Sequence, residues 1–284
     1  MSYERYLDEE PAIITAALTG GVHGKEANPA VPETPDEIAT AAEAAEAAGA
    51  AVVHLHARRS NGERAFETEQ FQAVTEAVRE ATDDVIIQHS TGGTAAPDAL
   101  RHEPLRTDPP PEMASLDMGP LNRYEHLTSE NTRGLIDSLH AEMVNRGIKP
   151  ELEVFNGGHL SEVHGLLERQ ELAEPVYATL IFGPGLTRPR PRNFLTAIDD
   201  LPAGATFNTL GFGRHQLPFT VMGLLFGGHV RVGLEDNVYL RAGELAESNA
   251  QLVARTVELA GHLGRPVATP RQARSILNLE PRPS

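Results

Sequence analysis

The sequence predicts an α/β protein that folds as a single (β/α)8 barrel, the TIM-barrel fold. Short apolar segments alternate with helical patterns along the 284 residues, as in this fold. The apolar segments are continuously hydrophobic, which is typical of parallel strands covered by helices. No linker, repeat or low-complexity tract divides the chain. We therefore expect one domain over residues 1–284, with a doubly wound open sheet as the alternative fold.

The first half of the chain carries four of the expected strands, over residues 12–18, 51–56, 84–90 and 113–118. Thr34 is a predicted helix N-cap, because Pro35 follows it and Glu37 can complete a capping box. Gly49 ends that alanine-rich helix. Further helices are expected over 67–81 and 130–145, and the proline-rich stretch 104–111 is expected to be a loop.

The second half repeats the alternation with strands over 151–155, 175–182, 205–210 and 229–234. The helices are expected over 159–169, 193–198, 218–226 and 247–263. Thr269 followed by Pro270 is a typical helix start. It predicts an extra C-terminal helix over 269–277.

Composition limits the classes of partner. The net charge is −16, and the only lysines are Lys25 and Lys149. Such a surface repels nucleic acids and anionic membranes, so neither is expected as a partner. An acidic chain with so little lysine indicates adaptation to high salt, or a GC-rich genome that favours Arg and Ala codons. The charged start and the lack of an apolar run of about 20 residues predict a cytoplasmic protein.

Two histidines close the second strand. His54 and His56 are two residues apart, so their side chains point to the same face. Two imidazoles on one face can chelate one metal ion. The apolar residues before them place the pair at the carboxyl end of the strand, where α/β enzymes carry their chemistry. Without cysteine, any metal must be bound by nitrogen and oxygen ligands. The alternative is a pair of buried, hydrogen-bonded histidines.

A glycine-containing turn, Ser90-Thr91-Gly92-Gly93, follows the third strand. Its glycines let backbone amides turn inward beside the hydroxyls, and such a turn can bind a carboxylate or a phosphate. The alternative is an ordinary strand-to-loop turn. By strand alternation, His89 faces away from Ser90 towards the helices, and we expect it to be structural.

Charged residues cluster at the end of the eighth strand, where Glu235 and Asp236 follow Arg231. A carboxylate here could complete a His-His-carboxylate metal site, and an acid beside an arginine could act as a general base. A surface salt bridge is the alternative, but the apolar helix before the strand favours an inward position. Three further arginines follow strand six and either stay solvated or meet an anionic ligand such as coenzyme A phosphates: Arg188, Arg190 and Arg192.

Several segments match one family in order along the chain. They include His-Leu-His-Ala-Arg at 54–58, Gln-His-Ser-Thr-Gly-Gly at 88–93, Glu-Leu-Glu-Val at 151–154 and the glycine-rich run through Gly-Leu-Glu-Asp-Asn at 227–237. On these segments the chain resembles the β-keto acid cleavage enzyme family. The resemblance covers nearly the whole chain.

The resemblance implies a zinc-dependent barrel that converts a β-keto acid and acetyl-CoA into acetoacetate and a new acyl-CoA. It also implies a homo-oligomer, a tetramer. The implied metal ligands are His54, His56 and Glu235. The implied substrate-carboxylate residues are Ser90, Gly93 and Ser115. The implied base is Asp236, supported by Arg231, with Glu153 in the proton network.

One position departs from the pattern of the family members that cleave an amino substrate. Those members have a glutamate in the loop after strand one that receives the substrate's ammonium, and Val22 stands at that position here. An apolar side chain cannot pair with a cation. We therefore expect substrates with uncharged or acidic tails.

Two other functions are compatible with the same residues. A zinc-dependent class II aldolase-like lyase or hydrolase would use the metal site without coenzyme A. A non-catalytic metal- or ligand-binding barrel would use neither acid nor base, and the presence of both groups argues against it. Product analysis with and without acetyl-CoA separates the two enzymes.

Overall fold

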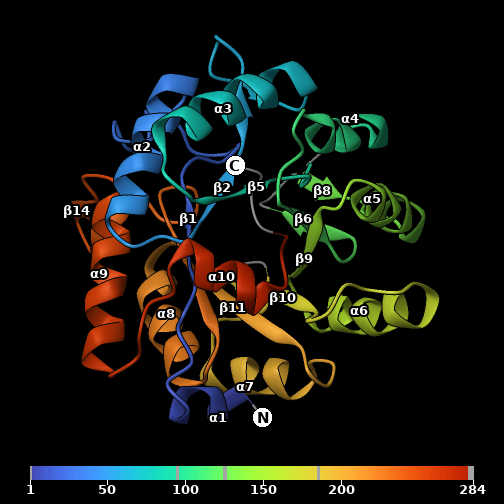
Figure 1. Cartoon of the computed structure of the whole chain (residues 1–284), viewed down its shortest axis with the longest axis vertical. Helices are drawn as coiled ribbons and strands as arrows, with labels where there is room; N and C mark the ends of the chain where they lie inside the picture. The colour runs from blue at the N-terminus through green and yellow to red at the C-terminus, as the bar shows by residue number, and fades with distance from the viewer. Residues whose placement is uncertain (1, 94–95, 124–126, 184–185, 281–284) are drawn as a thin grey trace.

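The computed structural model describes residues 2–93, 96–123, 127–183 and 186–280. Within these ranges, eight parallel strands close into a barrel, because the last strand of the ring pairs with the first. Helices surround the ring of strands (Figure 1). The predicted (β/α)8 barrel is confirmed, and the closed ring excludes the doubly wound open sheet.

The barrel strands follow one another around the ring in chain order. Their bounds are β1 Ile14–Ala17, β2 Val52–Leu55, β5 Ile86–His89, β6 Met113–Asp117, β9 Lys149–Val154, β10 Tyr177–Phe182, β11 Thr206–Gly211 and β12 His229–Val232. All eight predicted strand positions are correct. Because all the strands run the same way, their carboxyl ends meet at one mouth of the barrel.

The main helices of the outer layer are α2 Pro35–Ala47, α3 Thr68–Ala81, α5 Arg133–Asn145, α6 Gly157–Arg169, α7 Pro191–Asp199, α8 Gln216–Leu225 and α9 Asn249–His262. The predicted capping box at the start of α2 forms: the Thr34 hydroxyl accepts from the Glu37 amide at 3.3 Å, and the Glu37 carboxylate accepts from the Thr34 amide at 3.2 Å. None of the described helices combines the length and apolar character needed to span a membrane.

The segment between β5 and β6 differs from the prediction. The structure places a short helix α4, Asp98–His102, and a 3-10 turn η1, Glu103–Arg106, where a loop was expected to begin. A five-residue helix is too short to show a helical apolar period. Pro104 marks the first turn of η1, a position where proline is tolerated. The remaining proline-rich stretch up to Pro111 is irregular, as predicted.

Short helices and two-stranded hairpins lie at the ends of the barrel. They are α1 Ser2–Leu7, the 3-10 turn η2 Gly213–His215, and the hairpins β3 Ala57–Arg58 with β4 Arg64–Ala65, β7 Leu121–Arg123 with β8 Leu127–Ser129, and β13 Tyr239–Arg241 with β14 Glu244–Leu245. The β3–β4 hairpin directly follows the two histidines. It therefore brings Arg64 back over the barrel mouth.

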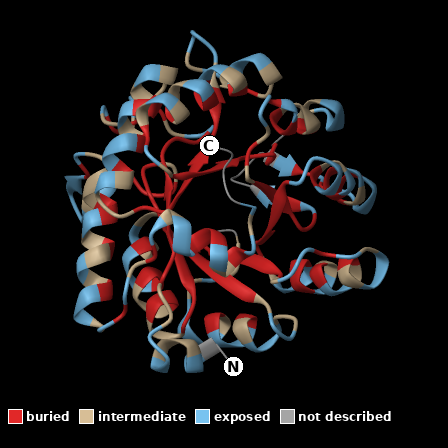
Figure 2. Cartoon of the chain, viewed as in Figure 1, coloured by how far each residue is buried: buried red, intermediate tan, exposed pale blue. Residues whose placement is uncertain are grey.

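The amino ends of the strands are closed by the C-terminal helix α10, Pro270–Leu277, which crosses the middle of the ring in Figure 1. Its Ala273 and Leu277 pack on residues at the starts of the strands, among them Val52 and Tyr177. Figure 2 shows buried strands and helices that are buried only on their inner side. α10 and the apolar residues at the strand starts form an apolar plug at the amino end of the barrel. The carboxyl mouth is therefore the polar end.

His89 faces the helices, as predicted from strand alternation. Its Nδ1 lies 2.7 Å from the carbonyl of Pro104 and its Nε2 lies 2.8 Å from the hydroxyl of Thr75 on α3. The ring is fully buried and packs on Phe71. Burial lowers the pKa of His89 to about 4. The imidazole is therefore a neutral structural group at neutral pH.

The buried neutral ring of His89 makes the fold sensitive to acid. Between the folded pKa of about 4 and the usual 6.5, the unfolded state binds the proton more tightly, so this contribution to stability is complete above pH 6.5 and is lost as the pH falls towards 4. We expect His89 to contribute about 3 kcal/mol of the loss between pH 7 and pH 4. Urea unfolding of wild type and His89→Gln at both pH values measures it. Equal losses in the two proteins would contradict the assignment.

Candidate active site

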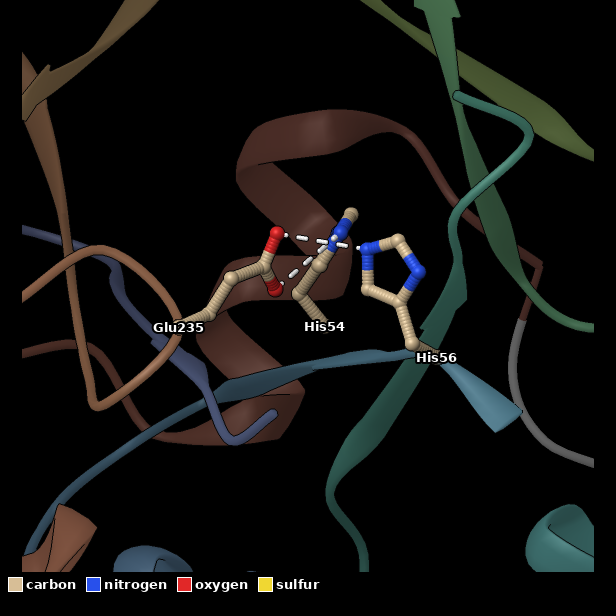
Figure 3. A group of neighbouring side chains, drawn as sticks. All are labelled: His54, His56 and Glu235. Atoms are coloured by element: carbon tan, nitrogen blue, oxygen red, sulfur yellow. Dashed lines mark hydrogen bonds and ion pairs between the residues drawn. The ribbon is translucent and has the colours of Figure 1, made fainter. Parts of the chain in front are cut away.

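His54, His56 and Glu235 converge at the carboxyl mouth of the barrel. The Nε2 atom of His54 lies 3.7 Å from Oε2 of Glu235, and the Nε2 atom of His56 lies 3.2 Å from Oε1 of the same carboxylate. Both rings lie on the same side of that carboxylate in Figure 3. One ligand atom from each residue falls within 4.8 Å of the other two. The predicted metal-ligand set therefore comes together in space from β2 and the loop after β12.

This group has the chemistry of a divalent-cation site. Burial lowers the pKa of His54 well below its usual value and that of His56 to about 4, so both rings are neutral with lone pairs to donate. Burial raises the pKa of Glu235, but the opposing charge of Arg231 outweighs it and holds that pKa well below its usual range. The Oε2 atom of Glu235 is buried and makes no hydrogen bond within the described ranges. A bound cation would satisfy it.

A sharp turn after β12 delivers Glu235 to the histidines. Gly233 has φ +143°, and a Cβ there would lie 2.1 Å from the carbonyl oxygen of Ala17, so only glycine fits. The Leu234 amide donates to the side-chain oxygen of Asn249 at 2.9 Å. Asn249 in turn donates to the carbonyl of Leu18 at 3.1 Å. One buried amide side chain thus ties the end of β1 to the Glu235 turn.

Arg231 lies at the centre of a cluster of carboxylates. Its guanidinium donates to both oxygens of Asp236, at 2.9 and 3.1 Å, and contacts Glu235 at 2.9 Å and Glu153 at 3.4 Å. The Arg231 and Asp236 side chains are 3% and 0% exposed. The cluster is therefore buried, and the alternative of a surface salt bridge is wrong.

Two carboxyl groups of this cluster have raised pKa values. Burial raises the pKa of Asp236 to about 6, against the opposing charge of Arg231. Burial and the neighbouring Asp117 raise the pKa of Glu153 well above its usual value. Glu153 lines the cleft beside the histidines, whereas Asp236 lies beneath Arg231 and does not contribute to the cleft wall. The cleft wall therefore carries Glu153, a carboxyl group with a raised pKa, while Asp236 lies behind the arginine.

The turn after β5 brings one hydroxyl to the cleft and is supported by two buried residues. Ser90 lines the cleft, and its hydroxyl accepts from the Gly92 amide at 3.3 Å. Ser115 is fully buried and accepts from the Thr91 amide at 3.1 Å. A Cβ at Gly93 would lie 2.4 Å from the Arg101 side chain. The structure thus places Ser90 at the cleft surface, while Ser115 and Gly93 lie behind it and shape the turn.

Val22 lies on the cleft wall with 52% of its surface exposed. Arg64 of the β3–β4 hairpin lines the same cleft. Its side chain lies against Gly21, so closely that a Cβ at position 21 would be 3.2 Å from the Nε atom of Arg64. It donates to the carbonyl of Gly92 and stacks on the Phe66 ring at 4.6 Å. The opposite wall is apolar and contains Phe155, Ile181, Leu210 and Phe212. Arg188, Arg190 and Arg192 are exposed.

Sequence reasoning missed three residues of this region. Gln88 hydrogen-bonds to Nδ1 of His54 at 2.7 Å, Asn249 holds the Glu235 turn, and Arg64 reaches the cleft from a hairpin. A signal existed for Gln88, since alternation puts it on the inner face with Ser90. Arg64 and Asn249 carry no such signal, because a hairpin and a helix start bring them back from remote positions.

Comparisons with known proteins agree with this geometry. A family model described as beta-keto acid cleavage enzyme matches residues 11–279. The chain is 42% identical over 272 residues to the 3-keto-5-aminohexanoate cleavage enzyme of Fusobacterium nucleatum, covering 95% of this chain and 99% of the relative. It is 36% identical over 274 residues to the 3-oxoadipate:acetyl-CoA acetyltransferase of Cupriavidus necator, covering 95% of each.

A solved structure of similar fold is the binary complex of ObcA with oxaloacetate. Its TM-score is 0.78 at 21% identity, with 88% of this chain and 68% of that chain covered. At this identity the likeness shows the barrel fold alone.

Removal of the central arginine tests the electrostatic role of the cluster. Arg231→Met leaves the Glu235 and Asp236 carboxylates buried without their cation, which should cost about 3–5 kcal/mol of unfolding free energy. Arg133→Met, which breaks an exposed pair with Glu162, is the matched control and should leave the unfolding free energy nearly unchanged. Urea unfolding in the presence of a chelator measures both. A loss at Arg231 as small as the control would contradict the account.

Proposed function

The chain belongs to the β-keto acid cleavage enzyme family, and from that premise we propose that it exchanges acyl groups between a β-keto acid and acetyl-CoA. The products are acetoacetate and a new acyl-CoA. The name of the Cupriavidus relative supports the use of acetyl-CoA. The observation that carries the proposal is the convergence of His54, His56 and Glu235 beside the Arg231 cluster.

We propose that His54, His56 and Glu235 bind zinc. Two neutral imidazoles and one carboxylate form a ligand set typical of catalytic zinc, which keeps a further position for substrate. Bound zinc would supply Lewis-acid polarisation of the ketone group of the β-keto acid. The burial of both imidazoles excludes bulk water from the ligand atoms.

The turn after β5 is the proposed binding site for the reacting carboxylate. The Ser90 hydroxyl faces the cleft. Its oxygen accepts from the Gly92 amide, so its hydrogen is free to donate to a carboxylate oxygen of the substrate. Ser115 and Gly93 contribute indirectly. Ser115 accepts a hydrogen bond from the backbone amide of Thr91, and the absence of a side chain at Gly93 lets the Arg101 side chain pack against the turn. Together they would orient the ketone towards His54 and His56.

Asp236 is the proposed base. Arg231 donates one hydrogen bond to each carboxylate oxygen of Asp236, and each oxygen keeps a second lone pair that can accept a proton. Glu153 contacts Arg231 from the cleft side, and its raised pKa suits a group that donates a proton. Asp236 would thus accept a proton on one side of the Arg231 guanidinium, and Glu153 would donate one on the other side.

The direct test is an assay of a panel of β-keto acids with and without acetyl-CoA. The proposal predicts acetoacetate only when both substrates are present. Cleavage that is independent of acetyl-CoA would instead indicate an aldolase-like lyase or a hydrolase. A homo-oligomer and a cytoplasmic location stay predictions, which light scattering and cell fractionation would check.

The zinc proposal predicts that His54→Ala loses both bound metal and activity but keeps the fold. The ligand lies at a strand end, outside the packed layers of the barrel. Metal content by mass spectrometry, activity, and far-UV circular dichroism measure the three properties. His102→Ala, which alters a histidine paired with Glu142 on the outer layer, is the control. Full zinc content in His54→Ala would remove His54 from the ligand set.

The base proposal predicts that Asp236→Asn keeps metal and fold but loses about 10²–10⁴-fold in kcat. The substitution removes the proton acceptor and changes little volume. Glu153→Gln, assayed in parallel, distinguishes the two carboxyl groups. Full activity of Asp236→Asn with a large loss in Glu153→Gln would assign the base to Glu153.

The tail proposal predicts that acids with uncharged or acidic tails have a higher kcat/KM than 3-keto-5-aminohexanoate. Val22 offers no partner to an ammonium, and Arg64 on the same cleft repels it. Val22→Glu should raise the relative activity towards the amino substrate. The comparison is made at saturating acetyl-CoA. An amino substrate that is best by a wide margin in wild type would contradict the assignment of Val22 to the tail site.

A further inference from the structure

A buried chain of hydrogen bonds runs from His54 into the centre of the barrel. Nδ1 of His54 lies 2.7 Å from Oε1 of Gln88, and Nε2 of Gln88 lies 2.6 Å from Oε2 of Glu151. These three residues come from three different strands, β2, β5 and β9. None is more than 1% exposed. Bulk water therefore does not reach the hydrogen bonds of the chain.

The carboxylate at the inner end determines the direction of every hydrogen bond in this chain. A carboxylate accepts hydrogen bonds and donates none. Glu151 accepts from the Thr179 hydroxyl and, at 3.4 Å, from the Asn208 amide. Its other oxygen must accept from the NH2 group of Gln88. The Gln88 amide is thus held with its carbonyl oxygen towards His54.

That orientation selects one tautomer of His54. Because the Gln88 oxygen can only accept, Nδ1 of His54 must carry the proton, and Nε2 keeps its lone pair. Nε2 is the atom that faces Glu235, at 3.7 Å. A flipped Gln88 amide would donate to Nδ1 and move the proton to Nε2, where it would block metal binding.

We infer that Glu151 and Gln88 are positioning residues that set the tautomer of His54 for metal binding. Glu151 acts through Gln88 and contacts neither the metal ligands nor the cleft. The inference rests on the proposed metal site for its functional meaning. The tautomer itself is a property of the metal-free chain.

The test uses the full-length chain with two readouts. Long-range 1H–15N NMR of metal-free protein labelled with [15N]histidine reports the His54 tautomer, and the spectrum of His54→Asn identifies its signals. Competition with a chelator gives the zinc dissociation constant. Glu151→Gln should shift His54 away from the Nδ1–H form and weaken zinc binding by about 10–100-fold.

A charge-swap variant provides the rescue. In Gln88→Glu/Glu151→Gln, the carboxylate at position 88 accepts from Nδ1 of His54 and from the new amide, whose oxygen accepts from Thr179. This variant should restore the tautomer and bring zinc affinity to within about threefold of wild type. Thr179→Val perturbs the same Glu151 carboxylate on the side away from Gln88. As the matched control, Thr179→Val should keep both the His54 tautomer and the zinc affinity of wild type.

The outcomes separate this inference from the proposed function. A Glu151→Gln variant that keeps the tautomer and zinc affinity of wild type overturns it, as does a Thr179→Val variant that loses as much as Glu151→Gln. If wild type binds no zinc, the metal proposal fails and the NMR result alone decides the tautomer. If circular dichroism shows that Glu151→Gln does not fold, Gln88→Leu replaces it: loss of the Nδ1–H form there, with recovery in the charge swap, supports the inference, and no loss overturns it.

Discussion

The buried positive charge of Arg231 is the constraint on which the site depends. A guanidinium that is 3% exposed is stable only if carboxylates surround it, and Asp236, Glu235 and Glu153 do so from three sides. The carboxylates depend on the arginine in the same way, because three acids at one barrel mouth would repel one another without its positive charge. Glu235 uses its contact with Arg231 to stay ionised where it meets the histidines. The proposed metal ligands and the proposed acid–base pair therefore form one electrostatic unit.

The barrel provides this unit with a rigid frame. The apolar plug of α10 and the strand starts closes one end, so polar groups gather at the other. The turn at Gly233 and the Asn249 bridge bring Glu235 across to β2. The Gln88–Glu151 chain fixes the ring of His54 from below. Each of these contacts joins different strands, so the site exists only when the barrel is closed.

Most of the frame, and the convergence of His54, His56 and Glu235, could be predicted from the sequence, whereas the residues that support them could not. The fold, the strand positions and the α2 capping box follow from local periodicity and helix-start signals, which a single sequence contains. His54 and His56 share a face because strands alternate. Alternation gives the face of a residue but not its depth, so it did not reveal that Ser115 lies behind the Ser90 turn or that Asp236 lies beneath Arg231. Contacts between remote strands, such as Gln88 with Glu151, have no local signal.

The central claim is that this site transfers the acetyl group of acetyl-CoA onto the two-carbon fragment released from a β-keto acid. Tracing the label of [13C2]acetyl-CoA by NMR tests it most directly. Exchange predicts label at carbons 3 and 4 of acetoacetate and an unlabelled acyl group in the new acyl-CoA. Cleavage of the β-keto acid with all label still in acetyl-CoA would contradict the account.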